Sequence, residues 1–236
     1  MPVDVRADRR SPDHHIPVPA MLQRWAHTSF LHWPFAPEVV RPLVVDELDL
    51  DLHEGKAWVS LTPFVLQTRP VALIDSPETN VRTYVRGPDG RPGLWFLSLD
   101  AASPILALAG RALAPYWLGD LTVDPGKVVR YEGQRSAPFD DARYRIEVRP
   151  GRRLRDHEID PLADWLTARW RANVKRGPAL GVVGVEHEPW PLHRAEVTRL
   201  DETLLAAADL PDPQDDPVVH YADEVTVRLG WPRLVR

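Results

Sequence analysis

One short run, residues 77–85, carries the side chains with the clearest chemical potential in this sequence. In an extended strand alternate residues share a face, so a carboxylate, an amide, a guanidinium and a phenol would line one side. They belong to Glu78, Asn80, Arg82 and Tyr84. Facing an enclosed interior, Glu78 would have a raised pKa and act as a general acid or base, and Arg82 would hold a carboxylate through paired hydrogen bonds. Facing water, the same run is an ordinary surface strand, and the pattern alone leaves both interpretations open.

The strand expected next in the chain favours the enclosed interpretation. Residues 94–97 read Leu-Trp-Phe-Leu and are apolar on both faces, which is typical of a strand in the centre of a sheet. Two further candidates for contact with a ligand are His32 and Trp95. Each has a plain alternative, since a histidine can be buried and hydrogen-bonded and a tryptophan can pack in a core. If some of the nine tryptophans face a cavity, a planar or apolar ligand is favoured.

Lysines are scarce, which limits covalent chemistry. An imine with a carbonyl substrate needs a lysine amine in the site, and the chain has only Lys56, Lys127 and Lys175. The first two fall in expected turns. Lys175 is expected at a helix C-terminus, where the helix dipole favours a cation. We therefore expect no Schiff-base lysine.

Other residue patterns predict neither a metal site nor a cofactor. The chain has no cysteine, and it lacks a glycine-rich phosphate loop, a G-x-S-x-G elbow and an H-E-x-x-H helix. The run Glu186-His187-Glu188, followed by His193, resembles a metal half-site. In a strand, however, His187 points away from its two neighbours, so these groups do not converge.

Composition and charge exclude several classes of protein. The chain has 236 residues, of which 44% are hydrophobic and 27% charged, enough for a sizeable core and too apolar for a disordered chain. The net charge is −5 and basic residues form no cluster, which argues against nucleic-acid binding. No apolar stretch is long enough to span a membrane and the N-terminus lacks a secretory signal, so we expect no membrane partner and a cytoplasmic location.

Turn and cap signals place the candidate residues in a mainly antiparallel sheet. Hairpins are expected over residues 48–61, 80–99 and 128–148, with further strands at 21–33, 181–187, 195–200 and 218–229, the last with a break near Ala222. Helices are expected after the capping residues Ser103, Asp160 and Asp201, and a short one at Pro37. The helix after Asp160 would extend to about Val174 along one apolar face.

The expected domain organisation is simple. Residues 1–16 are expected to form a flexible leader and residues 17–236 a single domain. Strands outnumber helices and no βαβ alternation occurs. The predicted fold class is therefore α+β: a large antiparallel sheet, closed or nearly closed into a barrel, with about three helices packed outside.

Four separated motifs carry a family resemblance. They lie at residues 32–35, 77–85, 93–101 and 185–192. Together they resemble the YqjF-like family of uncharacterised bacterial proteins, over roughly residues 20–235. That family looks like a remote branch of the acetoacetate decarboxylase-like superfamily, whose fold is a cone-like antiparallel β-barrel around a small-molecule cavity. The resemblance implies the same barrel here.

The resemblance also implies which chemistry is absent. In the decarboxylases a Gly-Arg pair is followed by a tyrosine and then by Pro-Lys-Lys, and a lysine of this motif forms the Schiff base. The pair at residues 110–111 and Tyr116 match, but Leu118 and Gly119 occupy the lysine positions. Glu78 matches the pocket glutamate of the decarboxylases by position. The resemblance thus implies an acid/base residue and a tyrosine without the covalent catalyst.

These observations predict binding of a small carbonyl or carboxylate compound and non-covalent acid/base chemistry on it. Glu78 would be the general acid or base, and Tyr116 would donate a hydrogen bond to a developing oxyanion. Asn80 and Arg82 would orient the substrate. Two alternatives stay open: a non-enzymatic ligand-binding module, or a structural module whose cavity is filled by its own tryptophans. We expect no cofactor, and a monomer or homodimer.

Overall fold

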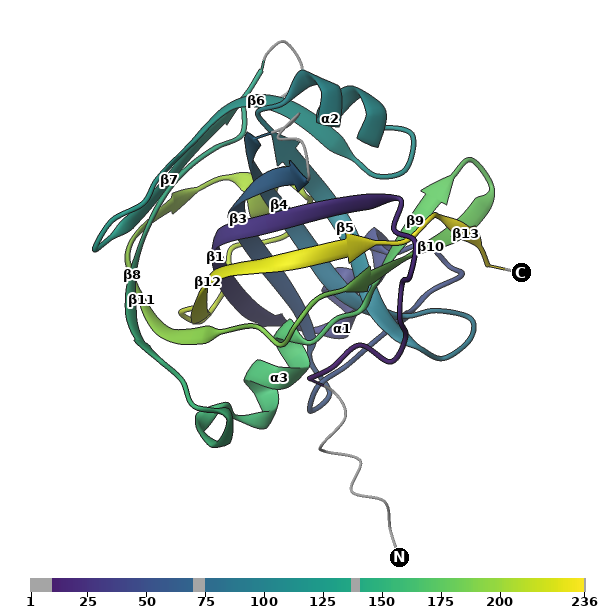
Figure 1. Ribbon diagram of the computed structural model, residues 1–236, viewed down its shortest axis with the longest axis horizontal. Helices are drawn as coiled ribbons and strands as arrows, with labels where there is room; N and C mark the ends of the chain where they lie inside the picture. Colours follow the sequence, from purple (N-terminus) through teal and green to yellow (C-terminus); the bar gives the residue numbers. More distant parts are fainter. Residues whose placement is uncertain (1–9, 70–74, 137–140, 236) are drawn as a thin grey trace, which may run out of the picture.

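The computed structural model describes residues 10–69, 75–136 and 141–235, and one sheet of thirteen strands predominates in them (Figure 1). The strands are β1 (Met21–Phe35), β2 (Asp49–Leu50), β3 (Ala57–Arg69), β4 (Asp75–Arg86), β5 (Pro92–Ala101), β6 (Tyr116–Asp124), β7 (Val129–Arg135), β8 (Arg143–Arg153), β9 (Arg171–Arg176), β10 (Ala179–Glu186), β11 (Leu192–Glu202), β12 (Val218–Leu229) and β13 (Arg233–Leu234). The helices are α1 (Pro37–Val40), α2 (Pro104–Gly110), α3 (Pro161–Thr167) and α4 (Leu204–Ala207), with 3-10 turns η1 (Arg41–Leu43) and η2 (Asp156–Glu158).

The pairing of these strands closes on itself. One circuit runs through β5, β6, β7, β8, β11, β12, β1, β3 and β4 and returns to β5. The pairings of β9 with β5 and of β10 with β12 close a second, shorter circuit. Neighbours are antiparallel except where β5 pairs with β6 and with β9. The strands β12, β1, β3, β4 and β5 belong to both circuits and form a wall between them (Figure 1).

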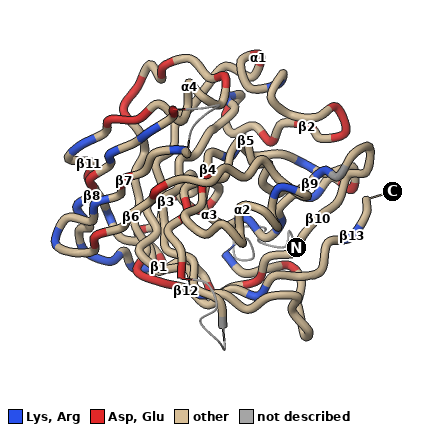
Figure 2. The backbone as a smooth tube through the Cα atoms, turned by 90° about the horizontal axis from the view of Figure 1, so that it is seen from above, with Lys and Arg blue, Asp and Glu red and all other residues tan. Residues whose placement is uncertain are grey.

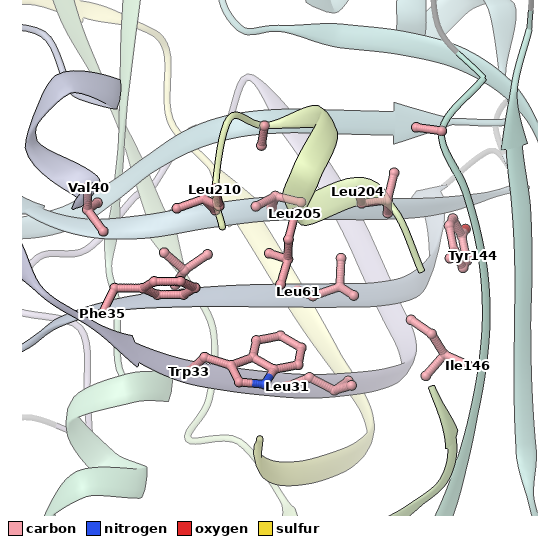
Figure 3. Close-up of a cluster of buried hydrophobic side chains, with 14 of the residues drawn as sticks. Leu31, Trp33, Phe35, Val40, Leu61, Tyr144, Ile146, Leu204, Leu205 and Leu210 are labelled. Atoms are coloured by element: carbon pink, nitrogen blue, oxygen red, sulfur yellow. The ribbon is translucent and has the colours of Figure 1, made fainter. Parts of the chain in front are cut away.

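This shared wall presents two different faces because strand residues alternate in direction. On one face Val81 and Val85 of β4 join a cluster of buried side chains with Tyr144 and Ile146 of β8. Leucines of α4 and the residues after it cover the same cluster, as Leu204, Leu205 and Leu210 show above Leu61 and Trp33 in Figure 3. On the other face the alternate residues of β4 line a cavity.

Local signals for the helices α2 and α3 are confirmed. The Ser103 hydroxyl accepts a hydrogen bond from the Leu106 N–H at 3.4 Å, and the Asp160 carboxylate accepts one from the Ala163 N–H at 2.7 Å. Each cap is followed by a proline at the first helical position, where the missing N–H costs nothing. The short helix expected at Pro37 is also present.

Two expected helices differ in extent. The helix after Asp160 ends at Thr167, and residues 171–176 form β9, because their backbone groups pair with both β5 and β10. Lys175 therefore lies in a strand, where its amine is 2.8 Å from a Glu47 carboxylate oxygen, and not at a helix end. The helix expected after Asp201 begins only at Leu204, because β11 continues to Glu202.

The expected hairpins are confirmed in two cases out of three. Residues 80–99 lie in the hairpin of β4 and β5, and residues 128–148 in that of β7 and β8. The pairing expected within residues 48–61 was wrong beyond the bridge between His53 and Lys56. The strand β2 pairs instead with the end of β4, since the pairing of β3 with β4 stops at Val59. The break expected near Ala222 is absent, as β12 is continuous.

Residues outside the two circuits complete the surface. In the described part of the expected leader, Ile16 is buried and Asp13 forms an ion pair with Arg171 at 2.6 Å; residues 1–9 lie outside the described residues.

Lysine, arginine, aspartate and glutamate gather on outer strands and loops with both signs intermixed (Figure 2). Within the described residues, the helices are all too short to cross a bilayer.

Candidate ligand-binding cavity

A cavity of about 350 Å³ lies between the shared wall and the strands β9 and β10. Residues of α2 and of the segment after it, among them Leu106, Gly110 and Leu113, form part of its lining. Most of the lining is apolar and includes Trp25, Phe30, Phe64, Phe96 and Trp190. The polar side chains in it are those of Gln23, Thr28, Thr62, Glu78, Asn80, Arg82, Tyr116, Thr167, Arg169 and His187. Ligand-binding sites commonly combine such an apolar lining with a few polar groups.

Four of the six candidate site residues line this cavity. Glu78, Asn80 and Arg82 face it from β4, and Tyr116 faces it from the start of β6. The three β4 residues are alternate positions in a strand whose register with β3 is regular, so the period-two pattern brings them to one face. The geometry therefore agrees with the interpretation in which the polar face of residues 77–85 points to an enclosed interior.

The other two candidates, His32 and Trp95, do not line the cavity. Leu94 and Phe96 face it, so the intervening Trp95 points to the opposite face, where its indole N–H donates to the Leu43 carbonyl at 3.1 Å. His32 is fully buried, with Nδ1 3.0 Å from the Tyr84 hydroxyl. The positions of both residues thus fit their alternatives, a core tryptophan and a buried, hydrogen-bonded histidine.

Glu78 is a buried acid with an unused oxygen. Its side chain is 3% exposed, and its Oε2 atom has no hydrogen-bond partner among the described residues. Burial raises its pKa to about 8, and the nearby Asp100 carboxylate adds to this rise. Asp100 is itself held by Arg135 in a buried, bidentate ion pair with both distances at 2.9 Å. At neutral pH Glu78 is therefore mostly protonated, able to donate a proton or a hydrogen bond.

Arg82 is a buried cation that lacks an acidic partner. The side chain is 6% exposed, its Nε atom is unpartnered, and no described carboxylate lies within ion-pair distance of it. Its guanidinium lies 5.6 Å from the centre of the Phe30 ring. The Oδ1 atom of Asn80 is likewise buried and unpartnered. Since an unpaired buried charge is costly, this wall of the cavity favours a ligand with an anionic group.

Tyr116 is positioned by the Gly-Arg pair that precedes it. A Cβ atom on Gly110 would lie 2.3 Å from the tyrosine ring, so only glycine allows the ring to approach the end of α2 this closely. The Arg111 Nε–H donates to the Tyr116 carbonyl at 3.1 Å. Burial, with a smaller effect of Glu78, raises the pKa of Tyr116 well above its ordinary value. The phenol therefore remains a hydrogen-bond donor at neutral pH.

His187 is a cavity residue that the sequence analysis considered only as a metal ligand. Its ring lies between Trp170 and Trp190, with both ring centres 4.7 Å away. Nδ1 donates to the Glu188 carbonyl at 2.5 Å, which leaves Nε2 as a hydrogen-bond acceptor. Burial lowers its pKa to about 4, so the ring is neutral. The sequence signal for this position is the alternation of side chains along the strand. Because Glu186 faces outward, the next residue, His187, faces inward.

Arg169 also lines the cavity, and nothing in the sequence predicted it. Its Nη1 atom is 2.6 Å from an Asp51 oxygen, and both side chains are 3% exposed. The guanidinium stacks on the rings of Trp165 and Tyr84 at 4.2 Å and 4.8 Å. The two ion-pair partners are 118 positions apart in the chain, so local spacing carries no signal for the pair.

The lysines lie away from this site. Lys56 and Lys127 are exposed, and Lys175 is paired with Glu47. None of the three is among the described residues that line the cavity. In the part of the chain that the structure describes, no group of three histidine, aspartate or glutamate side chains could hold a metal ion.

Comparisons with known proteins agree with this architecture. A family model, DUF2071, uncharacterized conserved protein, matches residues 22–226. The uncharacterized protein YqjF of Bacillus subtilis (strain 168) is 34% identical over 222 residues, 90% of each chain. The enduracididine biosynthesis enzyme MppR complexed with pyruvate has a TM-score of 0.62 at 14% identity, over 94% of this chain and 93% of that one. An acetoacetate decarboxylase-like enzyme from Sphingomonas wittichii RW1 has a TM-score of 0.62 at 13% identity, over 96% and 98%. At these identities the structural likeness concerns the fold.

Proposed function

The chain belongs to the DUF2071 family, and we propose that it binds a small carbonyl-containing carboxylate in the cavity and transfers a proton on it without a covalent intermediate. The observation that carries the proposal is the set of unpartnered, buried polar atoms on one wall. On β4 these are Oε2 of Glu78, Oδ1 of Asn80 and Nε of Arg82, and Oγ1 of Thr28 on β1 belongs to the same set. Buried polar atoms in folded proteins are almost always hydrogen-bonded, so atoms without a partner in a cavity indicate a ligand.

Each polar group has a role that its environment supports. Arg82, a cation without an acidic partner, binds the carboxylate of the ligand. Glu78 is protonated at neutral pH and gives its proton to the carbonyl oxygen, or takes one from the neighbouring carbon once ionised. Tyr116 and Asn80 hydrogen-bond to the ligand and keep it in place.

The proposed chemistry proceeds without an imine. Leu118 and Gly119 stand where the resembling decarboxylases carry lysines, and a side chain at Gly119 would collide with the Gln134 carbonyl at 2.5 Å. An amine is therefore excluded at that position by space as well as by residue type. We further propose that the closed nine-strand circuit is a cone-like barrel of the acetoacetate decarboxylase type, which the structural likeness supports.

A second candidate function is ligand binding without turnover. The mainly apolar lining, with Trp25, Phe30, Phe64 and Trp190, favours it, because such a lining contributes affinity and no proton transfer. The cavity volume of about 350 Å³ argues against the further alternative of a site filled by its own tryptophans.

A two-part experiment tests the leading proposal. Small oxo and hydroxy acids are first screened for thermal stabilisation of the protein, with Arg82→Met as the variant expected to lose the effect. For acids that bind, incorporation of solvent deuterium next to the carbonyl is followed by NMR. We expect exchange in the wild type and a loss of at least tenfold in Glu78→Gln with binding retained. Equal exchange in both proteins would refute the role of Glu78.

A parallel measurement tests the absence of an imine. The protein is incubated with a bound oxo acid and sodium borohydride, which reduces an imine to a stable amine, and its mass is then determined. We expect no added mass on any of the three lysines. A stoichiometric adduct would overturn the non-covalent mechanism.

A further inference from the structure

Two buried arginines line the cavity, and both contact Tyr84. The Arg82 guanidinium hydrogen-bonds to the Tyr84 hydroxyl, and the Arg169 guanidinium lies 4.8 Å from the centre of the tyrosine ring. Because they share this contact, the two positive charges lie close enough to repel each other. For the same reason, one small ligand can reach both.

The protein supplies too little negative charge for these arginines. Oδ2 of Asp51 is 2.6 Å from Nη1 of Arg169, and Oδ1 of the same carboxylate is 2.9 Å from Nη2 of Arg86. Nη2 of Arg169 and Nε of Arg82 are buried, and neither has a hydrogen-bond partner in the described part of the chain. Arg86 is 42% exposed, so water solvates part of its charge. The two arginines that line the cavity still share at most one carboxylate.

The rest of the lining adds no negative charge at neutral pH. Glu78 is the one acidic side chain among the described residues that line the cavity, and its pKa of about 8 keeps it mostly protonated. Asp51 lines a separate outer pocket and not the cavity, so its carboxylate lies behind Arg169. A buried cation without a counter-charge is costly. The cavity therefore favours a ligand with two negative charges.

The polar side chains form one continuous row along the shared wall. Asn80 lies between Glu78 and Arg82 on β4, and Thr62 of β3 is paired opposite Asn80. Arg169 approaches the end of this row beyond Arg82, at Tyr84. Two guanidiniums on two different elements, each with an unpartnered nitrogen, match two separate carboxylates better than one doubly charged group. A compact ligand with several polar groups fits this row.

We propose that the ligand is a compact oxo-dicarboxylate that places one carboxylate at Arg82 and the other at Arg169. This inference rests on the proposed function and names its substrate class. The oxo oxygen lies at Glu78 and Tyr116, where a protonated acid and a phenol donate hydrogen bonds. The two carboxylates neutralise the two guanidiniums, so binding removes the repulsion between them.

A set of matched acids tests this substrate class on the wild-type chain. The probes are 2-oxopentanedioate, 2-oxopentanoate, pentanedioate and methyl phosphate, with dissociation constants measured by calorimetry. The second acid carries a methyl group in place of the second carboxylate, the third lacks the oxo group, and methyl phosphate carries its charge on one group. We expect 2-oxopentanedioate to bind at least tenfold more tightly than 2-oxopentanoate, and more tightly than the other two.

Variants at the two arginines test the position of each carboxylate. In Arg169→Met, affinity for 2-oxopentanedioate should fall at least tenfold, and affinity for 2-oxopentanoate should stay within about threefold, since its carboxylate binds Arg82. Arg82→Met should weaken binding of both acids at least tenfold. Asp51 keeps Arg86 as a partner in Arg169→Met, so no carboxylate is orphaned. Arg91→Met, which removes an exposed arginine outside the cavity, is the control and should change neither affinity.

The outcomes separate this inference from the proposed function. If 2-oxopentanoate binds the wild type as tightly as 2-oxopentanedioate, or if Arg169→Met weakens both acids equally, the second carboxylate site is refuted and the proposed function stands. Tighter binding of methyl phosphate would also refute it, in favour of a single doubly charged group. If none of the acids binds the wild type, both proposals fail. The comparison of ligands uses the wild type alone, so it decides the question even where circular dichroism shows that a variant does not fold.

Discussion

Replacing Glu78 by glutamine should change how the stability of the protein depends on pH. The folded chain holds this carboxyl in its neutral form up to a pKa of about 8, against an ordinary value of 4.5. Between these values the unfolded chain releases the proton and the folded chain keeps it. The group's contribution therefore makes the free energy of unfolding decrease as pH rises through this window, with no further change below 4.5 or above about 8.

The magnitude follows from the size of the rise in pKa. A tenfold change in proton affinity corresponds to about 1.4 kcal/mol, so the full rise from 4.5 to about 8 corresponds to roughly 5 kcal/mol. Between pH 5.5 and 7.5, both within the window, the carboxyl should lower the free energy of unfolding by about 2–3 kcal/mol. Glutamine resembles the neutral acid in shape and cannot ionise, so this component disappears in the variant.

Urea unfolding at pH 5.5, 6.5 and 7.5 provides the assay. The free energy of unfolding of Glu78→Gln minus that of the wild type should increase by about 2–3 kcal/mol from pH 5.5 to pH 7.5. Titration of the histidines affects both proteins alike and cancels in the difference. Glu38→Gln, which alters an exposed residue of α1, serves as the control and should show no such trend. A pH-independent difference for Glu78→Gln would mean that the carboxyl is not held neutral in a closed cavity.

Three further substitutions test the elements that support the site. Asp51→Asn should lower the free energy of unfolding by about 3–5 kcal/mol, because it leaves Arg169 buried without a counterion; adding Arg169→Met should recover part of this loss in urea unfolding, and an equal loss in both proteins would contradict the pairing. Gly110→Ala should weaken binding of oxo acids at least tenfold, since its methyl group displaces the Tyr116 ring; unchanged binding by calorimetry would show that the phenol is not needed. Asp160→Ala should cost about 1 kcal/mol through loss of the α3 cap, and Asp160→Asn should retain most of that stability in thermal unfolding; equal losses would show that the cap is not the cause.

Much of the local structure could be predicted because its causes are local. The turn residues between β4 and β5 specify a hairpin, and a capping residue followed by proline specifies the start of α2 and of α3. The helix expected to continue to Val174 was wrong for a reason that is not local. Val174 continues the apolar helix face of the residues after Asp160, but hydrogen bonds from β5 and β10 on both sides make residues 171–176 a strand.

The candidate site could be predicted only in part. The alternation of side chains along a strand shows which residues share a face, but not whether that face points to the interior or to solvent. It places Glu78, Asn80 and Arg82 on one face, but it does not say whether that face looks inward. The same ambiguity made Trp95 a candidate, although it is turned away from the cavity by the register of β5. The same alternation turns His187 away from Glu186 and Glu188, which argues against a metal site but does not say that the ring faces a cavity.

What the sequence by itself determined is the chemical inventory: the shared face of Glu78 and Arg82, the tyrosine behind its Gly-Arg pair, and the scarcity of lysine. These depend on residue type and on the fixed period of a strand. Only the tertiary structure decided that the face borders a cavity, that Arg169 and His187 join it, and that Asp51 pairs with Arg169 and Arg86 while Arg82 has no carboxylate partner among the described residues. The physical reason is that these contacts join residues far apart in the chain, and they form only when β9, β10 and β12 close the second circuit.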